Sequence, residues 1–163
     1  ARELKTAAEA AAIREGNRCS ALGFAAAERM LRASRIRGRS LVYRGRKVTS
    51  EMLRFAIEVA CLEAEAVSDH TIVAGGKQGC DPHETGYGPL YAQEPIILDI
   101  FPRSQQTGYF GDITRTFALK SVKPEMRHVH DIVREANLSA SAGVRARTLP
   151  RERLRLRFQD RQD

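Results

Sequence analysis

Residues 95–117 read PIILDIFPRSQQTGYFGDITRTF, and this stretch decides both the fold class and the candidate site. Two runs rich in β-branched and aromatic residues, 95–101 and 109–119, flank a polar connection. Such a pattern predicts two strands of an antiparallel hairpin. Each run carries a carboxylate, Asp99 in the first and Asp112 in the second. The stretch therefore places two like charges on neighbouring strands.

A hairpin that closes around residues 105–106 would place Asp99 directly opposite Asp112. Opposed residues share one face of a sheet, with Cβ atoms about 4.5–5.5 Å apart, and like charges there are destabilising. A divalent cation would compensate, and hard oxygen ligands suit Mg, Mn, Zn or Co. Thr114 and Thr116 would lie on the same face and support the ligands through their hydroxyls. Two interpretations stay open from the pattern: a metal site, or aspartates that face solvent.

Two helices are expected before these strands. The TAAE sequence at 6–9 fits a capping box and predicts a first helix to about Ala33, with Gly16 and Gly23 as weak points. Thr49 is expected to cap a second helix. The apolar face of that helix is predicted to consist of Met52, Phe55, Ile57, Val59 and Leu62.

The remaining segments complete an α+β pattern. Residues 35–39 are expected to form a basic loop, 41–43 a short strand and 71–74 another strand. Pro124 suits the first position of a third helix, which Gly143 would end. The order of two helices, three strands and a helix predicts helices packed on an antiparallel sheet rather than alternating βαβ units.

Charge and apolar content limit the classes of partner. The net charge is +7, and residues 144–163 contribute seven arginines against three acidic residues, so we assign the basic character to a tail. We therefore do not expect a nucleic-acid partner, although a basic tail that binds nucleic acid or an acidic partner remains an alternative. No apolar run approaches the roughly 20 residues that span a bilayer, and no signal peptide is evident. We expect a cytoplasmic protein without a membrane partner.

Cysteine spacing excludes the common zinc and redox motifs. Cys19, Cys61 and Cys80 are widely spaced, and no CxxC pair occurs. We expect three free thiols, buried or partly buried.

The hairpin resembles a known family of metal-dependent enzymes. Its sequence ILD at 97–99, followed by GYFGDITRTF at 108–117, is similar to the first metal-ligand hairpin of the pita-bread metallopeptidases. This superfamily (M24) includes methionine aminopeptidase, aminopeptidase P, prolidase and creatinase. The connection here is about two residues longer than the commonest form. RELKT at 2–6, RKVTSE at 46–51 and the TIVAG and DPH segments at 71–83 extend the likeness, which is closest to aminopeptidase P and prolidase.

The resemblance implies a site and a substrate. Asp99 and Asp112 would be ligands of two divalent ions (Mn, Co or Zn), with Thr114 and Thr116 behind them. His83 matches a histidine that lies near the metals and contacts substrate. The substrates would be peptides with proline after the first residue, and a homodimer is a possible assembly.

Part of the family's donor set is missing. The family uses two aspartates, one histidine and two glutamates, yet no His-Gly-rich block or matching glutamate follows Asp112. We also expect the chain to lack the small domain that precedes the catalytic domain in the Xaa-Pro branch. No role is assigned to His70, His128 or His130. We therefore expect residues 1–143 to be the N-terminal half of a pita-bread domain, weakly active or inactive alone. Residues 144–163 would be an Arg-rich tail, for which an out-of-frame segment and a disordered segment are the two interpretations.

The alternative is a non-catalytic binding module on the same scaffold, with a protein or nucleic-acid partner. Loss of three ligands favours this class, whereas retention of both aspartates and His83 favours an enzyme.

Overall fold

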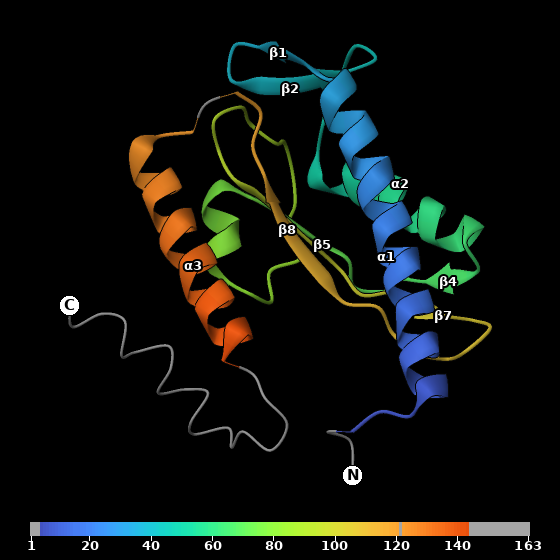
Figure 1. The fold of residues 1–163 in the computed structure, drawn as a ribbon. Helices are drawn as coiled ribbons and strands as arrows, with labels where there is room; N and C mark the ends of the chain where they lie inside the picture. Colours follow the sequence, from blue (N-terminus) through green and yellow to red (C-terminus); the bar gives the residue numbers. More distant parts are fainter. Residues whose placement is uncertain (1–3, 121, 144–163) are drawn as a thin grey trace. The chain divides into compact units, whose positions relative to one another are not determined.

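The structure is a computed structural model that describes residues 4–120 and 122–143. The predicted tail at 144–163 lies outside the described residues. The chain divides into two compact units, Ala1–Ser121 and Val122–Asp163, and the second contains the helix α3 (Pro124–Ala142). Figure 1 labels the elements of both. None of the described helices combines the length and the apolar character that a membrane crossing requires.

Two helices frame the first unit, and both begin at the predicted caps. In α1 (Ala7–Ala33), the Thr6 backbone N–H donates to the Glu9 carboxylate at 2.7 Å, while the Glu9 N–H donates to the Thr6 hydroxyl at 3.2 Å. In α2 (Ser50–Glu63), the Met52 N–H donates to the Thr49 hydroxyl at 3.2 Å. Side chains therefore satisfy N–H groups that a helix start leaves unpaired.

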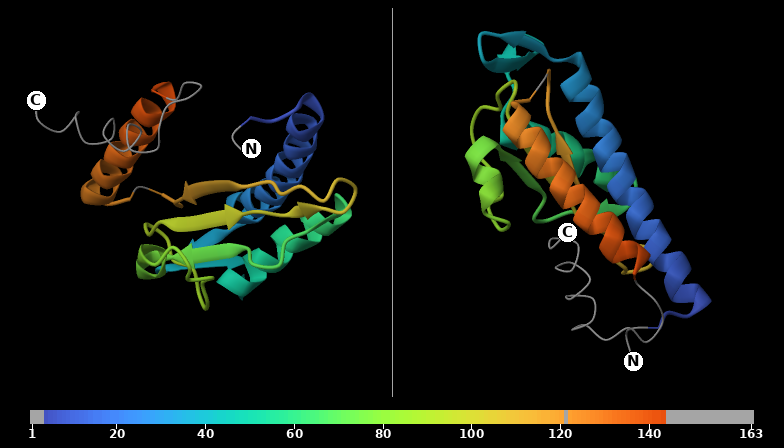
Figure 2. Two further views of the ribbon diagram at one scale, coloured as in Figure 1. Left: turned by 90° about the horizontal axis from the view of Figure 1, so that it is seen from below. Right: turned by 60° about the vertical axis from the view of Figure 1, so that its left-hand side comes forward.

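Short antiparallel sheets make up the rest of this unit. The described residues form β1 (Arg35–Arg37), β2 (Ser40–Tyr43) and β3 (Arg46–Lys47) in one sheet, β4 (Ala66–Val67) and β7 (Arg103–Ser104) in a second, and β5 (Ile72–Gly75), β6 (Ile96–Ile100) and β8 (Ile113–Phe117) in a third. Figure 2 shows β5, β6 and β8 side by side. A short 3-10 helix, η1 (Gly76–Cys80), follows β5. The α+β prediction is confirmed.

The predicted basic loop at 35–39 was wrong in its first part. Arg35 pairs with Val42, and Arg37 pairs with Ser40, so β1 is a strand rather than a loop. Ile36 supplies the apolar side chain on its inner face, where it pairs with the buried Leu41.

The core lies between one face of the β5–β6–β8 sheet and the two helices. The fully buried strand residues Ile96, Leu98 and Ile100 alternate along β6, as a half-buried strand requires. They belong to one cluster with residues of α1, α2, β2, β5 and the loops: Ala27, Leu31, Leu41, Val48, Leu53, Ile57, Cys61, Val73 and Leu90.

The apolar face predicted for α2 was largely wrong. Leu53, Ile57 and Cys61 are the apolar residues that the helix buries, at a spacing of four that keeps them on one face. Phe55 and Leu62 are 69% and 61% exposed. Only Ile57 of the predicted set is fully buried, because the orientation of α2 against the sheet, not apolar content, decides which face turns inward.

The glycines of α1 are contact points rather than mere weak points. A Cβ at Gly16 would lie 2.5 Å from the Phe110 carbonyl carbon and closer still to the Gly111 nitrogen. A Cβ at Gly23 would lie 3.0 Å from a methyl carbon of Ile57. The missing side chain at Gly16 therefore lets the backbone before β8 approach the helix directly.

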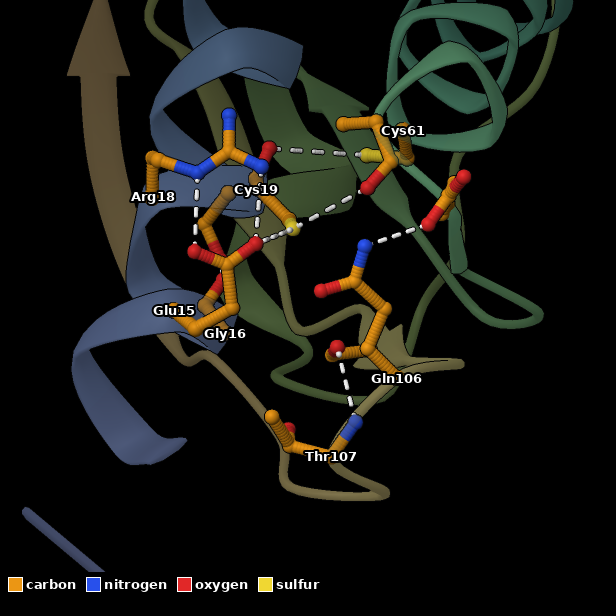
Figure 3. Close-up of polar contacts among 11 residues, drawn as sticks. Glu15, Gly16, Arg18, Cys19, Cys61, Gln106 and Thr107 are labelled. Carbon is orange, nitrogen blue, oxygen red and sulfur yellow. Dashed lines mark hydrogen bonds and ion pairs between the residues drawn. The ribbon is translucent and has the colours of Figure 1, made fainter. Parts of the chain in front are cut away.

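Two of the three thiols are buried between α1 and α2. Figure 3 shows the Cys19 thiol near the Glu15 carboxylate, which also accepts from Arg18, and the Cys61 thiol near the Cys19 carbonyl. Burial raises the pKa of the Cys61 thiol to about 11 and also raises the pKa of Cys19. All three thiols are free, as predicted, but the predicted burial was wrong for Cys80, which is exposed on η1.

Replacing Gly16 with alanine should destabilise the protein by about 1–3 kcal/mol, because a methyl group there forces α1 away from residues 110–111. The loss should exceed the gain of about 1 kcal/mol in helix propensity. Urea unfolding followed by circular dichroism measures it. Gly23→Ala is the matched control, since its methyl group meets side chains that can shift. A Gly16→Ala protein as stable as wild type would contradict the contact.

Thiol reactivity should separate the three cysteines. With Ellman's reagent at pH 8, we expect one thiol per chain to react within minutes and two to react only as the protein unfolds, because Cys19 and Cys61 are fully buried and protonated. Cys80→Ser should remove the fast phase. Three fast thiols in the native protein would rule out this packing.

Candidate metal centre

Asp99 lies in β6 and Asp112 directly precedes β8, and the two aspartates are not directly opposite. Asp99 pairs with Thr114, and Ile100 pairs with Ile113, so the hairpin is two residues out of the predicted register. Asp112 precedes Thr114 by two residues and lies directly before β8, so continued strand alternation would put it on the face of Asp99, as a diagonal neighbour. Diagonal neighbours in an antiparallel sheet are about 7–8 Å apart. The predicted direct opposition was wrong, and the shared face stays a prediction.

Contacts in the connection explain the shift. The Gly108 N–H donates to the Ser104 carbonyl at 2.8 Å, and the Ser104 N–H donates to the Tyr109 carbonyl at 3.0 Å. The Gln105 N–H donates to the Glu65 carbonyl at 2.8 Å, next to the pairing of β7 with β4. These bonds centre the hairpin between Gln106 and Thr107 instead of between residues 105 and 106.

Thr114 supports Asp99 directly. Its hydroxyl donates to the Asp99 carboxylate at 2.5 Å, which fixes one carboxylate oxygen and leaves the other open. Asp99 is half-buried, whereas Thr114 is exposed. Thr116 lies opposite Ile97, two residues after Thr114 on the same face of β8, and among the described residues it makes no hydrogen bond to either aspartate.

Asn17 of α1 holds the backbone of Asp112. The Asp112 N–H donates to the Asn17 side-chain oxygen at 3.0 Å, across 95 residues of sequence. Gly16, the neighbour of Asn17, contacts Gly111, the neighbour of Asp112. Sequence reasoning missed Asn17, because nothing in the local pattern links a helical asparagine to a distant strand.

A small pocket lies beside Asp99. Its volume is about 220 Å³, and it is lined by Ile72, Ala74, Gly79, Asp81, Pro82, Ile97, Asp99 and Thr114. The strand residues form its floor, and the segment after η1 forms a wall. Asp81, which sequence reasoning did not single out, adds a carboxylate to this lining.

His83 sits on the loop that forms this wall. Its backbone N–H donates to the Asp81 carboxylate at 2.9 Å, and its ring nitrogen Nδ1 lies 4.0 Å from the same carboxylate. The side chain is 94% exposed and does not line the pocket. Asp81 therefore fixes the turn that carries His83, and the imidazole is free to meet a ligand.

The remaining histidines lie elsewhere. His70 lines a separate cavity with Phe101 and Phe110. His128 and His130 are on α3, where the His130 ring lies 3.5 Å from the Asp131 carboxylate.

The donor chemistry suits a hard divalent ion but fills only part of its coordination shell. Carboxylate oxygens are the ligands such ions prefer, and four to six are usual. Within residues 4–120 and 122–143, no three His, Cys, Asp or Glu side chains cluster in a way that would hold an ion. Asp99 and Asp112 are thus compatible with a metal, and further ligands have to come from outside the described residues.

Comparison with known proteins identifies the family of this chain. The model of "Metallopeptidase family M24" matches residues 8–153. No curated protein matches the chain.

Several solved structures share the fold. An Xaa-Pro dipeptidase from Bacillus anthracis has a TM-score of 0.78 at 24% identity, over 95% of this chain and 40% of that chain. Proline aminopeptidase P II from Yersinia pestis has a TM-score of 0.69 at 28% identity, over 85% of this chain and 29% of that one. Prolidase from Pyrococcus furiosus has a TM-score of 0.69 at 20% identity, over 85% and 38%.

This chain therefore spans about two-fifths or less of the length of these solved relatives. The family model, in contrast, covers nearly the whole of it, including the strand pair that carries both aspartates. The chain belongs to metallopeptidase family M24.

Proposed function

We propose that this chain contributes Asp99 and Asp112 to the divalent-metal site of a peptidase that cleaves bonds preceding proline. The observation that carries the proposal is the β6–β8 register, which pairs Asp99 with Thr114, two residues from Asp112, beside a pocket that Asp99 lines. The family match and the Xaa-Pro peptidases among the solved relatives support the substrate class.

Each described residue has a definite task in this proposal. Asp99 and Asp112 would hold the metal, Mn, Co or Zn, and Thr114 orients the Asp99 carboxylate through its hydroxyl. Asn17 fixes the backbone at Asp112. Asp81 fixes the loop from which His83 would contact the bound peptide. Thr116 would contribute a second hydroxyl to the same face.

A bound divalent ion would polarise a peptide carbonyl and lower the pKa of water, which is the chemistry that hydrolysis at neutral pH requires. Two carboxylates alone should hold such an ion weakly. We therefore propose that the 163-residue chain alone has little or no peptidase activity, and that further ligands complete the centre. A second copy and a longer chain are the two sources.

A non-catalytic binding module is the second candidate. It is favoured by the small donor set, because the described residues offer two carboxylates and no larger metal-binding cluster. The two candidates differ in whether added metal binds to the aspartates at all.

Calorimetric titration with Mn²⁺ should detect weak binding, with a Kd of about 10⁻⁴–10⁻³ M, in the range of loosely built carboxylate sites. The double variant Asp99→Asn, Asp112→Asn should lose this binding, because amide groups carry no negative charge. Glu63→Gln is the control, since Glu63 is an exposed carboxylate of α2, the helix that packs on the inner face of the sheet. Equal affinity in wild type and the double variant would exclude the site.

An Xaa-Pro dipeptide assay tests the incomplete donor set. With saturating Mn²⁺, the chain alone should hydrolyse the dipeptide no faster than the double-asparagine variant. Turnover that depends on both aspartates would contradict the incomplete site while supporting the peptidase class. Metal binding without turnover in any assembly state would favour the binding module.

A further inference from the structure

The positive charge of the chain is concentrated in the last turns of α1 and in the β1–β2–β3 sheet that follows it. Residues 29–50 hold seven arginines, one lysine and no acidic residue. The rest of the chain, including 144–163, has 19 basic and 20 acidic residues. The assignment of the basic character to the tail alone was therefore incomplete.

The strand register gathers three of these charges on one face. Arg35 pairs with Val42, and Val42 pairs with Lys47, so these residues form one row across the sheet. Arg37 lies two residues from Arg35 and projects from the same face. All three cations are exposed. We call Arg35, Arg37 and Lys47 the basic face.

The turns at the sheet's ends add further arginines. Arg39 follows β1, and Arg44 lies between β2 and β3, where its φ is 47°. Both guanidinium groups lie over tyrosine rings: Arg39 over Tyr91 at 3.8 Å, and Arg44 over Tyr43 at 5.2 Å. These stacks hold planar cations beside the basic face.

Little within the protein neutralises this surface. Arg39 lies 3.6 Å from Glu94, and Arg32 pairs with Glu28 on α1. Among the described residues, Arg35, Arg37 and Lys47 have no acidic partner within ion-pair distance. Arg35 and Arg37 share β1 and Lys47 lies on β3, one strand away, so the three exposed cations repel one another through solvent and would attract an anion.

The character of the surface selects among polyanions. Seven of the eight cations are arginines, whose planar groups bind phosphate through two parallel hydrogen bonds. Arg35 and Arg37 are separated by about 6.6 Å along the strand. This spacing is close to the rise of two nucleotides, about 6.8 Å. No large exposed apolar side chain occurs between Leu22 and Phe55 to insert into a membrane.

We propose that the basic face and its turn arginines bind the phosphate backbone of a nucleic acid. The contacts are to phosphates rather than to base edges, so binding is independent of sequence and weakens steeply with salt. The surface is separate from the candidate metal centre. It follows the C-terminal end of α1, which rises about 24 Å between Asn17, at the level of Asp112, and Ala33.

Fluorescence anisotropy with a labelled 20-nucleotide oligo-U tests this at 50, 100 and 200 mM KCl. The triple variant Arg35→Glu, Arg37→Glu, Lys47→Glu should bind at least about tenfold more weakly than wild type at 50 mM. Its plot of log affinity against log salt should be shallower by about 2, since each lost phosphate contact contributes about 0.7 for a single strand.

The matched control reverses three exposed cations outside the sheet, Arg14→Glu, Lys77→Glu and Lys120→Glu, with the same change in net charge. It should bind within about threefold of wild type. Equal losses in both variants would mean a diffuse charge effect, and no loss in the triple variant would place binding elsewhere; either result overturns the proposal. Circular dichroism confirms that both variants are folded.

Competition identifies the class of anion. An unlabelled DNA duplex should displace the oligonucleotide, as a phosphate contact predicts. Polyglutamate or phosphatidylserine vesicles that bind the basic face more tightly than the oligonucleotide would overturn the nucleic-acid assignment in favour of an acidic protein or a membrane surface.

Discussion

The candidate site depends on the contact between α1 and the segment that enters β8. Gly16 lets this backbone approach the helix without an intervening side chain. The next helix residue, Asn17, accepts a hydrogen bond from the Asp112 N–H through its side-chain oxygen. Together with the bonds that Ser104 and Gln105 make in the connection, these contacts fix where β8 begins and therefore which residue faces Asp99 across the sheet. A different start would change every pairing of the hairpin, because antiparallel partners are set by one register.

Alternation along β6 explains why this arrangement tolerates a carboxylate in the middle of a buried strand. Leu98 and Ile100 are fully buried against the helices, while Asp99 between them turns to the opposite face. A slip of one residue would drive the carboxylate into the core, where an unpaired charge is costly. The inner face thus stabilises the fold and leaves the outer face open for ligands.

The sequence predicts the features that depend on neighbouring residues. Thr6 and Thr49 begin their helices as expected because capping is a contact over three residues. The shared face expected for Asp99 and Asp112 also rests on local alternation. The register was out by two residues because it is set by the bonds that Ser104 and Gln105 make in the connection.

Features that depend on tertiary packing could not be predicted from the sequence pattern. Asn17 and Asp81 reach the site through folding, without a local signal. Phe55 was predicted to lie on the apolar face of α2 but is exposed, because the packing of α2 against the sheet determines which face turns inward. Arg35 was predicted to lie in a loop. Its pairing with Val42, which aligns the basic face, depends on a partner strand that the run of basic residues does not reveal.

The central claim is that Asp99 and Asp112 are ligands of one metal site. Nuclear magnetic resonance with paramagnetic Mn²⁺ tests this claim most directly. Substoichiometric Mn²⁺ broadens the resonances of nuclei near the ion before all others. The account predicts that the amide signals of Asp99, Asp112 and Thr114 disappear first, together with those of the pocket segment around Asp81. Broadening that starts at other carboxylates, such as Asp69 or Asp131, and spares the β6–β8 pair would contradict it.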